Sequence, residues 1–204
     1  MRLLPLVFAA LLLALPAQAD SPARRLTAES TGTYELDKDH AFIVFSIKHL
    51  GFSDYIGRFN AFDAQLELNG TDPTKSSLSV TVMPESVDTH NQELEVKLRG
   101  PNYFNIAQFE KATFVSRQIT MSSRNRGTIT GDLTMLGITK PVTLDVTLNG
   151  AGHNSYANVY DVGFSATATI KRSDWGMTTL IPQVSDEVKL IISAEFHKKN
   201  SAGR

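Results

Sequence analysis

Along most of this chain apolar and polar residues alternate, which is the pattern of β-strands with one face turned to a core. The clearest run begins at Asp39. There Phe45, Ile47 and His49 share one face before Leu50-Gly51-Phe52 breaks the alternation. Further strands are expected at residues 34–36, 57–68, 77–83, 112–120, 127–136, 142–148, 159–170 and 188–196. Strands at this spacing predict an all-β sandwich or barrel, and about eight strands would make an up-and-down antiparallel barrel wide enough to hold one small ligand.

Two local features refine the start of the predicted barrel. Asp37-Lys38-Asp39 is expected to form a turn between the short first strand and the long second one. Residues 57–68 are expected to be the single strand that pairs with the long one, because Phe62, Ala64, Leu66 and Leu68 alternate with polar residues.

One stretch, residues 86–99, has helical rather than strand periodicity. Leu94 and Leu98 lie four residues apart, and Glu–Lys and Glu–Arg pairs share that spacing. Asp88 or Thr89 is expected to cap the start, and a Gly-Pro pair ends the helix. A short helix among many strands is expected to cover one open end of the barrel.

The first nineteen residues, 1–19, read as a signal peptide. Arg2 precedes an apolar run at residues 3–15, and Ala17-Gln18-Ala19 matches a cleavage site. The run is shorter than the ~20 apolar residues that a membrane span needs, and no later stretch approaches that length. The chain is therefore expected to be exported and to have no membrane span.

After the signal peptide, the chain divides into three parts. Residues 20–33 are polar and are expected to be a poorly ordered leader. Residues 34–198 form the barrel domain, and residues 199–204 form a C-terminal tail. This length fits one domain.

Charge and composition exclude several classes of partner. Removal of Arg2 leaves 19 basic against 21 acidic residues, a net charge of −2, so no basic excess points to nucleic acid or anionic lipid. The chain has no cysteine, so its fold needs no disulfide.

The late strands carry small residues on their expected inner face. Phe164, Ala166, Ala168 and Ile170 alternate with polar residues, and alanines at successive inward positions leave volume in a barrel. That volume is either a ligand cavity or is filled by large residues opposite. The candidates for filling it are Phe42, Phe45, Phe59, Phe62, Phe104, Phe109 and Phe114.

No motif in the chain indicates catalysis or a metal site. There is no G-x-S-x-G element, no phosphate-binding glycine pattern and no metal-type spacing among the five histidines. For an enzyme acting on a lipid or quinone head, the best candidate would be His49 with Asp88 or Glu95. We therefore expect that the protein is not an enzyme and has no catalytic residue.

Residues 171–177 are the second informative stretch. Either this is a turn in which Trp175 packs over a barrel end and Arg172 pairs with Asp174, or it is a cavity mouth. At a mouth, Arg172 would meet an anionic head group, while Trp175 and Met177 would meet an apolar tail.

The chain resembles the YceI-like family of periplasmic polyisoprenoid-binding proteins from about Tyr34 to Phe196. The matching motifs lie at residues 34–37, 45–51, 57–59, 86–89, 98–99, 103–105, 113–114, 131–142, 172–177 and 186–188. Their order along the chain makes a chance match improbable. The chain departs from the family pattern at Glu95, Lys97 and Trp175; the last would shorten or reshape a tunnel.

The resemblance implies a lipocalin-like barrel in the periplasm, with a tunnel that binds a long amphiphile such as a polyprenyl phosphate or quinone, and it implies no catalysis. Apart from this lipid ligand, we expect no cofactor and no metal. A strand edge left by imperfect closure would allow a homodimer. The alternative is an envelope-stress interaction protein with a filled barrel. The residues expected to bind the lipid are Phe45, Ile47, His49, Phe52, Phe62, Leu98, Phe104, Phe114, Phe164, Ala166, Ala168, Arg172, Trp175 and Met177.

Overall fold

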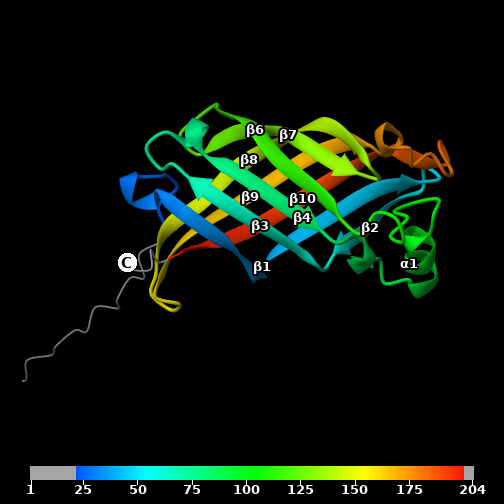
Figure 1. The fold of residues 1–204 in the computed structure, drawn as a ribbon, viewed down its shortest axis with the longest axis horizontal. Helices are drawn as coiled ribbons and strands as arrows, with labels where there is room; N and C mark the ends of the chain where they lie inside the picture. The colour runs from blue at the N-terminus through cyan, green and yellow to red at the C-terminus, as the bar shows by residue number, and fades with distance from the viewer. Residues whose placement is uncertain (1–21, 200–204) are drawn as a thin grey trace, which may run out of the picture.

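The computed structural model describes residues 22–199 and shows a closed antiparallel β-barrel (Figure 1). Eight strands close the barrel in the order β10-β9-β8-β7-β6-β4-β3-β1, and β1 pairs with β10. The strands are β1 (Gly32–His49), β2 (Ser53–Phe59), β3 (Phe62–Leu68), β4 (Ser77–Val82), β5 (Val87–Asp88), β6 (Ala112–Met121), β7 (Arg126–Met135), β8 (Ile138–Asn154), β9 (Val159–Lys171) and β10 (Val184–Lys198). The helices are η1 (Ala28–Ser30), η2 (Pro73–Lys75), η3 (Pro84–Ser86), α1 (Gln92–Arg99) and η4 (Arg172–Trp175). The prediction of a barrel of about eight strands is confirmed.

Strand β1 is longer than expected and changes partner along its length. Its first part pairs with β3 and its last part with β2, while β10 runs along its other side. The turn predicted at Asp37-Lys38-Asp39 is wrong, because these residues lie in an irregular stretch of the same strand. The single strand predicted at residues 57–68 is also wrong, because β2 and β3 are separate strands.

Strand β8 is likewise longer than the predicted 142–148. Met135 pairs with Ile138, so β7 and β8 are joined by a two-residue turn in which Leu136 and Gly137 both have positive φ angles, of 52° and 72°. Two successive positive φ angles make the tight turn whose twist matches a hairpin. Leu136 and Gly137 are therefore the only two residues between β7 and β8.

Helix α1 lies at one end of the barrel, as predicted, at the right-hand end of Figure 1 together with η4. It starts later than expected, because residues 87–88 pair with β2 as strand β5. Asn91 caps the helix through a 3.2 Å bond from the Leu94 amide, so the predicted caps Asp88 and Thr89 are wrong. Within residues 22–199 no helix has the length and apolarity to cross a membrane.

The stretch expected to be a leader packs on the barrel where it is described. Ala23 pairs with Ala151 of β8. Ser30 is fully buried, and its carbonyl accepts a 2.8 Å hydrogen bond from the Tyr34 hydroxyl. Strand β1 then begins at Gly32 instead of Tyr34. The predicted signal peptide lies outside the described residues.

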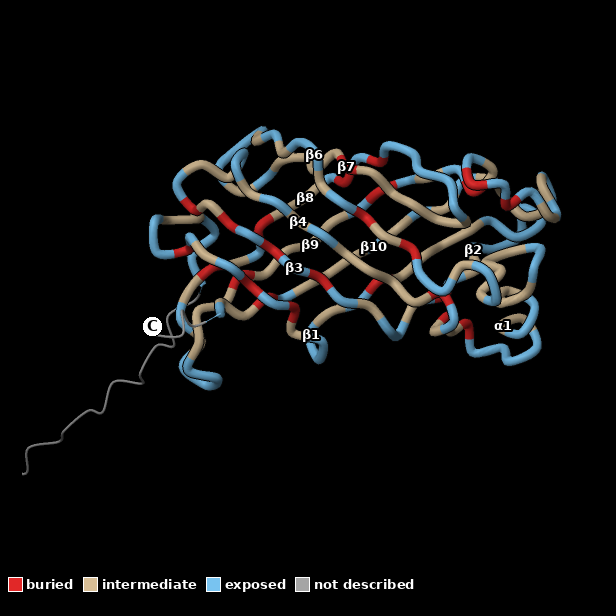
Figure 2. The backbone as a smooth tube through the Cα atoms, viewed as in Figure 1, coloured by how far each residue is buried: buried red, intermediate tan, exposed pale blue. Residues whose placement is uncertain are grey.

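Two buried clusters fill much of the barrel, and buried residues recur along its body (Figure 2). The first includes Tyr34, Leu66 and Phe196 and lies toward the end opposite α1. The second includes Phe114, Ala168 and Trp175. The barrel is therefore solid over part of its length, and open volume remains beside the second cluster.

Candidate functional site

The site is an apolar cavity of about 400 Å³ at the α1 end of the barrel. Inward residues of β1, β2 and β10 form its wall, α1 closes one side, and the segment after β9 closes another. Its lining residues are Phe45, Ile47, His49, Tyr55, Phe59, Thr89, Asn91, Glu93, Leu94, Lys97, Leu98, Tyr103, Phe104, Met135, Ile170, Arg172, Met177, Leu180, Val184, Val188 and Leu190. This volume is in the range of sites that bind small molecules.

Three phenylalanines form a continuous aromatic wall in the cavity. The ring centroids of Phe45 and Phe59 lie 5.6 Å apart, and those of Phe59 and Phe104 lie 5.5 Å apart, edge to face. Phe45 and Phe59 come from paired strands and Phe104 from the connector after α1, so the contact joins the helical cover to the barrel. Aromatic pairs in this geometry stabilise the wall beyond their buried area.

Gly57 makes room for this wall. It pairs with Phe45 across β1 and β2, and a Cβ atom placed on Gly57 would overlap the Phe45 ring. A ring that covers a strand glycine fixes its own position and the register of the strands. Gly57 does not have a positive φ angle, so its backbone conformation does not require glycine. The Phe45 ring beside it is what excludes a side chain at this position.

We expect Gly57→Ala to lower the free energy of unfolding by about 1–3 kcal/mol, because the added methyl overpacks the site. The displaced Phe45 ring would also narrow the cavity. Urea denaturation measures the first effect, with Gly163→Ala in β9 as the control, because a Cβ there would meet atoms no closer than 3.8 Å. Equal stability losses in the two variants would contradict the proposed packing.

Polar groups border the cavity near α1 and the β1–β2 hairpin. His49 and Tyr55 face each other with ring centroids 6.5 Å apart, and the Tyr55 hydroxyl donates to the Thr89 carbonyl at 3.5 Å. Lys97 and Glu93 add one cation and one anion from the helix. A tail inside the cavity could therefore leave a polar head at this border.

Arg172 lines the cavity but does not offer its charge to it. Its side chain is buried, and its guanidinium donates hydrogen bonds of 2.8–2.9 Å to four backbone carbonyls, those of Met177, Thr179, Val184 and Ser185. Burial lowers the pKa of this guanidinium, which remains the charged form. This geometry does not support the expected contact of Arg172 with an anionic head group. Among the described residues, no ion pair joins Arg172 to Asp174 either.

The structure brings together only some of the residues expected to bind a ligand. Those that line the cavity are Phe45, Ile47, His49, Leu98, Phe104, Arg172 and Met177. Phe114, Ala168 and Trp175 belong to the second buried cluster, which borders the cavity, and Ala166 packs against that cluster. In that cluster the large Phe114 and Trp175 fill the space beside the small alanines.

Three of the expected residues lie away from the cavity. Phe52 is 90% exposed on the β1–β2 hairpin, because the turn places it beyond the last paired residues. Phe62 and Phe164 pack against the first buried cluster toward the opposite end. Period two shows on which face a side chain lies but not at which height along the barrel.

Several residues that line the cavity were not predicted from the sequence, although the spacing of some of them indicated an inward side chain. Leu94 shares its helix face with Leu98, and Val188 and Leu190 alternate on β10. Leu180 had no such signal, because it lies in the loop after η4, where spacing does not predict direction.

The candidate acid–base pair for an enzyme is not assembled in the described residues. The pKa of Asp88 is lowered to about 2, because its carboxylate accepts hydrogen bonds from the His90 amide and two neighbouring side chains. A carboxylate with so low a pKa is a weak base. Glu95 accepts a 2.9 Å bond from the Thr89 amide, and no hydrogen bond joins His49 to either carboxylate.

Comparison with known proteins places this barrel in a family. The family model described as "YceI-like domain" matches residues 34–196, which is most of the chain and nearly the whole barrel. The chain belongs to the YceI-like domain family. The resemblance inferred from the sequence motifs is confirmed.

Relatives and solved structures of this YceI-like chain agree with the assignment. A UPF0312 protein of Yersinia pestis (strain Pestoides F) is 40% identical over 164 residues, which cover 79% of this chain and 84% of the relative. BcnA of Burkholderia cenocepacia superposes with a TM-score of 0.71 at 24% identity, over 78% of this chain and 98% of that one. A polyisoprenoid binding domain from Saccharophagus degradans superposes with a TM-score of 0.63 at 14% identity, over 81% and 98%.

Proposed function

We propose that this protein is a periplasmic carrier that holds the tail of an amphiphilic isoprenoid-type lipid, such as a polyprenyl phosphate or quinone, in its barrel. The observation that carries the proposal is an apolar cavity of about 400 Å³ whose polar residues gather at one border. The solved neighbour described as a polyisoprenoid binding domain has the same fold. The signal-peptide pattern of residues 1–19 supports a periplasmic location.

The cavity limits the length of tail that it can hold. If one chain carbon takes about the ~30 Å³ share of a liquid water molecule, 400 Å³ corresponds to about 13 carbons. Burying these at ~0.8 kcal/mol per methylene contributes roughly 10 kcal/mol before the costs of ordering. That is sufficient for binding, and a longer tail must extend out of the cavity or displace the second buried cluster.

We therefore expect affinity to rise from geraniol to farnesol, which have two and three isoprene units, and to change little from farnesol to geranylgeraniol, which has four. Displacement of the fluorescent probe N-phenyl-1-naphthylamine measures the three affinities under one condition. A gain for the fourth unit as large as that for the third would show that the cavity continues past Trp175, contrary to the structure.

The function itself is tested by native mass spectrometry of the mature protein from its own periplasm, followed by organic extraction. A discrete added mass, identified as an isoprenoid-type lipid, supports the carrier function and names the ligand. A bare protein mass together with no displacement of the probe by any isoprenoid overturns it. That result would favour an interaction protein that acts through its surface.

A further inference from the structure

The irregular part of β1 brings together side chains that a regular strand would separate. Asp37 pairs with Glu195 on β10, but the next pair is Phe42 with Ser193, so five steps along β1 match two along β10. In a regular strand Asp37 and His40 would point to opposite faces. Figure 1 shows the resulting bend of β1 near its label.

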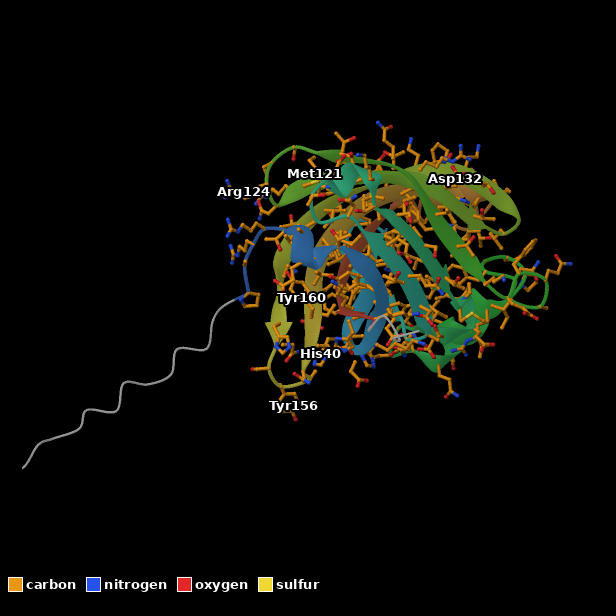
Figure 3. The ribbon with its side chains drawn as sticks, turned by 60° about the vertical axis from the view of Figure 1, so that its left-hand side comes forward. His40, Met121, Arg124, Asp132, Tyr156 and Tyr160 are labelled. Atoms are coloured by element: carbon orange, nitrogen blue, oxygen red, sulfur yellow. The ribbon has the colours of Figure 1, made fainter. Side chains whose placement is uncertain are left out.

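The bend places a histidine and two carboxylates within reach of one another. Asp37 Oδ2 and His40 Nδ1 lie 2.6 Å apart, and the candidate ligand atoms of Asp37, His40 and Glu195 all lie within 4.8 Å of one another. Figure 3 shows His40 on the side of the barrel that also carries Tyr160. Bulges of this kind often re-aim side chains to make a site.

A second layer of contacts holds the most enclosed member of the group. The Nε2 atom of His197 lies 3.1 Å from Asp37 Oδ2, and its Nδ1 atom lies 2.7 Å from Asp161 Oδ1. Asp161 in turn accepts a 2.7 Å bond from the Asn154 side chain. Carboxylate ligands of metal ions are commonly oriented by such outer hydrogen bonds.

We propose that Asp37, His40 and Glu195 form a surface site for a divalent transition-metal ion of the Zn²⁺ class. One imidazole nitrogen and two carboxylate oxygens are a donor set that Zn²⁺ accepts, with water completing four-fold coordination. An ion held by the three donors, whose ligand atoms lie within 4.8 Å of one another, would have metal–ligand distances of about 2 Å. Ca²⁺ fits less well, because it takes about 6–8 oxygen ligands.

Calorimetric titration of ZnCl₂ into the untagged, EDTA-treated and desalted protein tests the site, about one pH unit above the ordinary histidine pKa of ~6.5. We expect one saturable site. His40→Ala and Glu195→Gln should each weaken it at least about tenfold, and His197→Gln about 10–100-fold through loss of the outer contact. His40 is 65% exposed, so its replacement should leave the barrel folded, which a thermal melt in EDTA verifies.

The matched control is His90→Ala. His90 is also exposed and lies 4.0 Å from a carboxylate of Asp88, but no third ligand joins them among the described residues. Zn²⁺ affinity should be unchanged in this variant. The site is overturned if Zn²⁺ gives no saturable binding, if His40→Ala binds like the native chain, or if Ca²⁺ binds as tightly and independently of His40.

Discussion

Replacing Leu190 with tryptophan is expected to weaken binding of an isoprenoid tail by at least about 100-fold, or roughly 2.7 kcal/mol. Leu190 lines the cavity from β10, where it pairs with Phe45 on one side and Ala168 on the other. Leu190 also packs against the second buried cluster, which is already filled, so the indole ring of a tryptophan at this position must occupy the cavity. Displacement of N-phenyl-1-naphthylamine by farnesol measures the loss.

The neighbouring Ile191 supplies a matched control for Leu190→Trp. It follows Leu190 on β10 but points outward and is 48% exposed. Ile191→Trp introduces the same ring on the same strand outside the barrel, so farnesol affinity should stay within about twofold, a difference of roughly 0.4 kcal/mol. If both variants bind farnesol like the native chain, the ligand does not occupy this cavity, and the carrier function loses its structural basis.

Replacing Arg172 with methionine is expected to lower the free energy of unfolding by at least about 3 kcal/mol. The substitution removes the donors for four carbonyls, and each buried acceptor left without a donor costs ~1–3 kcal/mol. For a chain of this length, ~1 kcal/mol corresponds to about 2–4 °C in melting temperature. Urea denaturation and thermal melts measure the loss.

Arg172→Met should also weaken ligand binding, because Arg172 holds the segment that carries Met177, Leu180 and Val184 against the cavity. The control is Arg117→Met, since Arg117 is 70% exposed and pairs with Asp132 on the surface, where an ion pair contributes only ~0–1 kcal/mol. Reduced ligand affinity at native stability would instead indicate that Arg172 binds the head group directly.

Part of the fold and of the site follows from local patterns. Alternation indicated the strands and placed Phe45, Ile47 and His49 on one inward face, because the side-chain direction of a strand depends only on its neighbours in sequence. Helical spacing located Leu98, which lines the cavity. The family motifs carried the barrel class.

The structure differs from local expectation where the position of a residue depends on distant segments. Phe52 has the composition of a cavity residue, but a hairpin turn carries it into solvent. Trp175 and Ala168 were expected to meet a ligand, and the structure packs both in the second buried cluster, since which large residue lies opposite a small one depends on barrel register. The continuous β1 could not be predicted from Asp37-Lys38-Asp39, whose turn propensity is overridden by pairing with β10.

The sequence by itself determined the inward faces of the strands and the presence of one helix, because these depend on periodicity and local propensity, and its family motifs determined the barrel class. Tertiary structure decided where the barrel is solid and where it is open, because cavity volume is the difference between space enclosed by distant strands and the side chains that fill it. It also decided the role of Arg172. A buried guanidinium must satisfy its donors, and here the nearest acceptors are four carbonyls of a loop whose path no local pattern specifies.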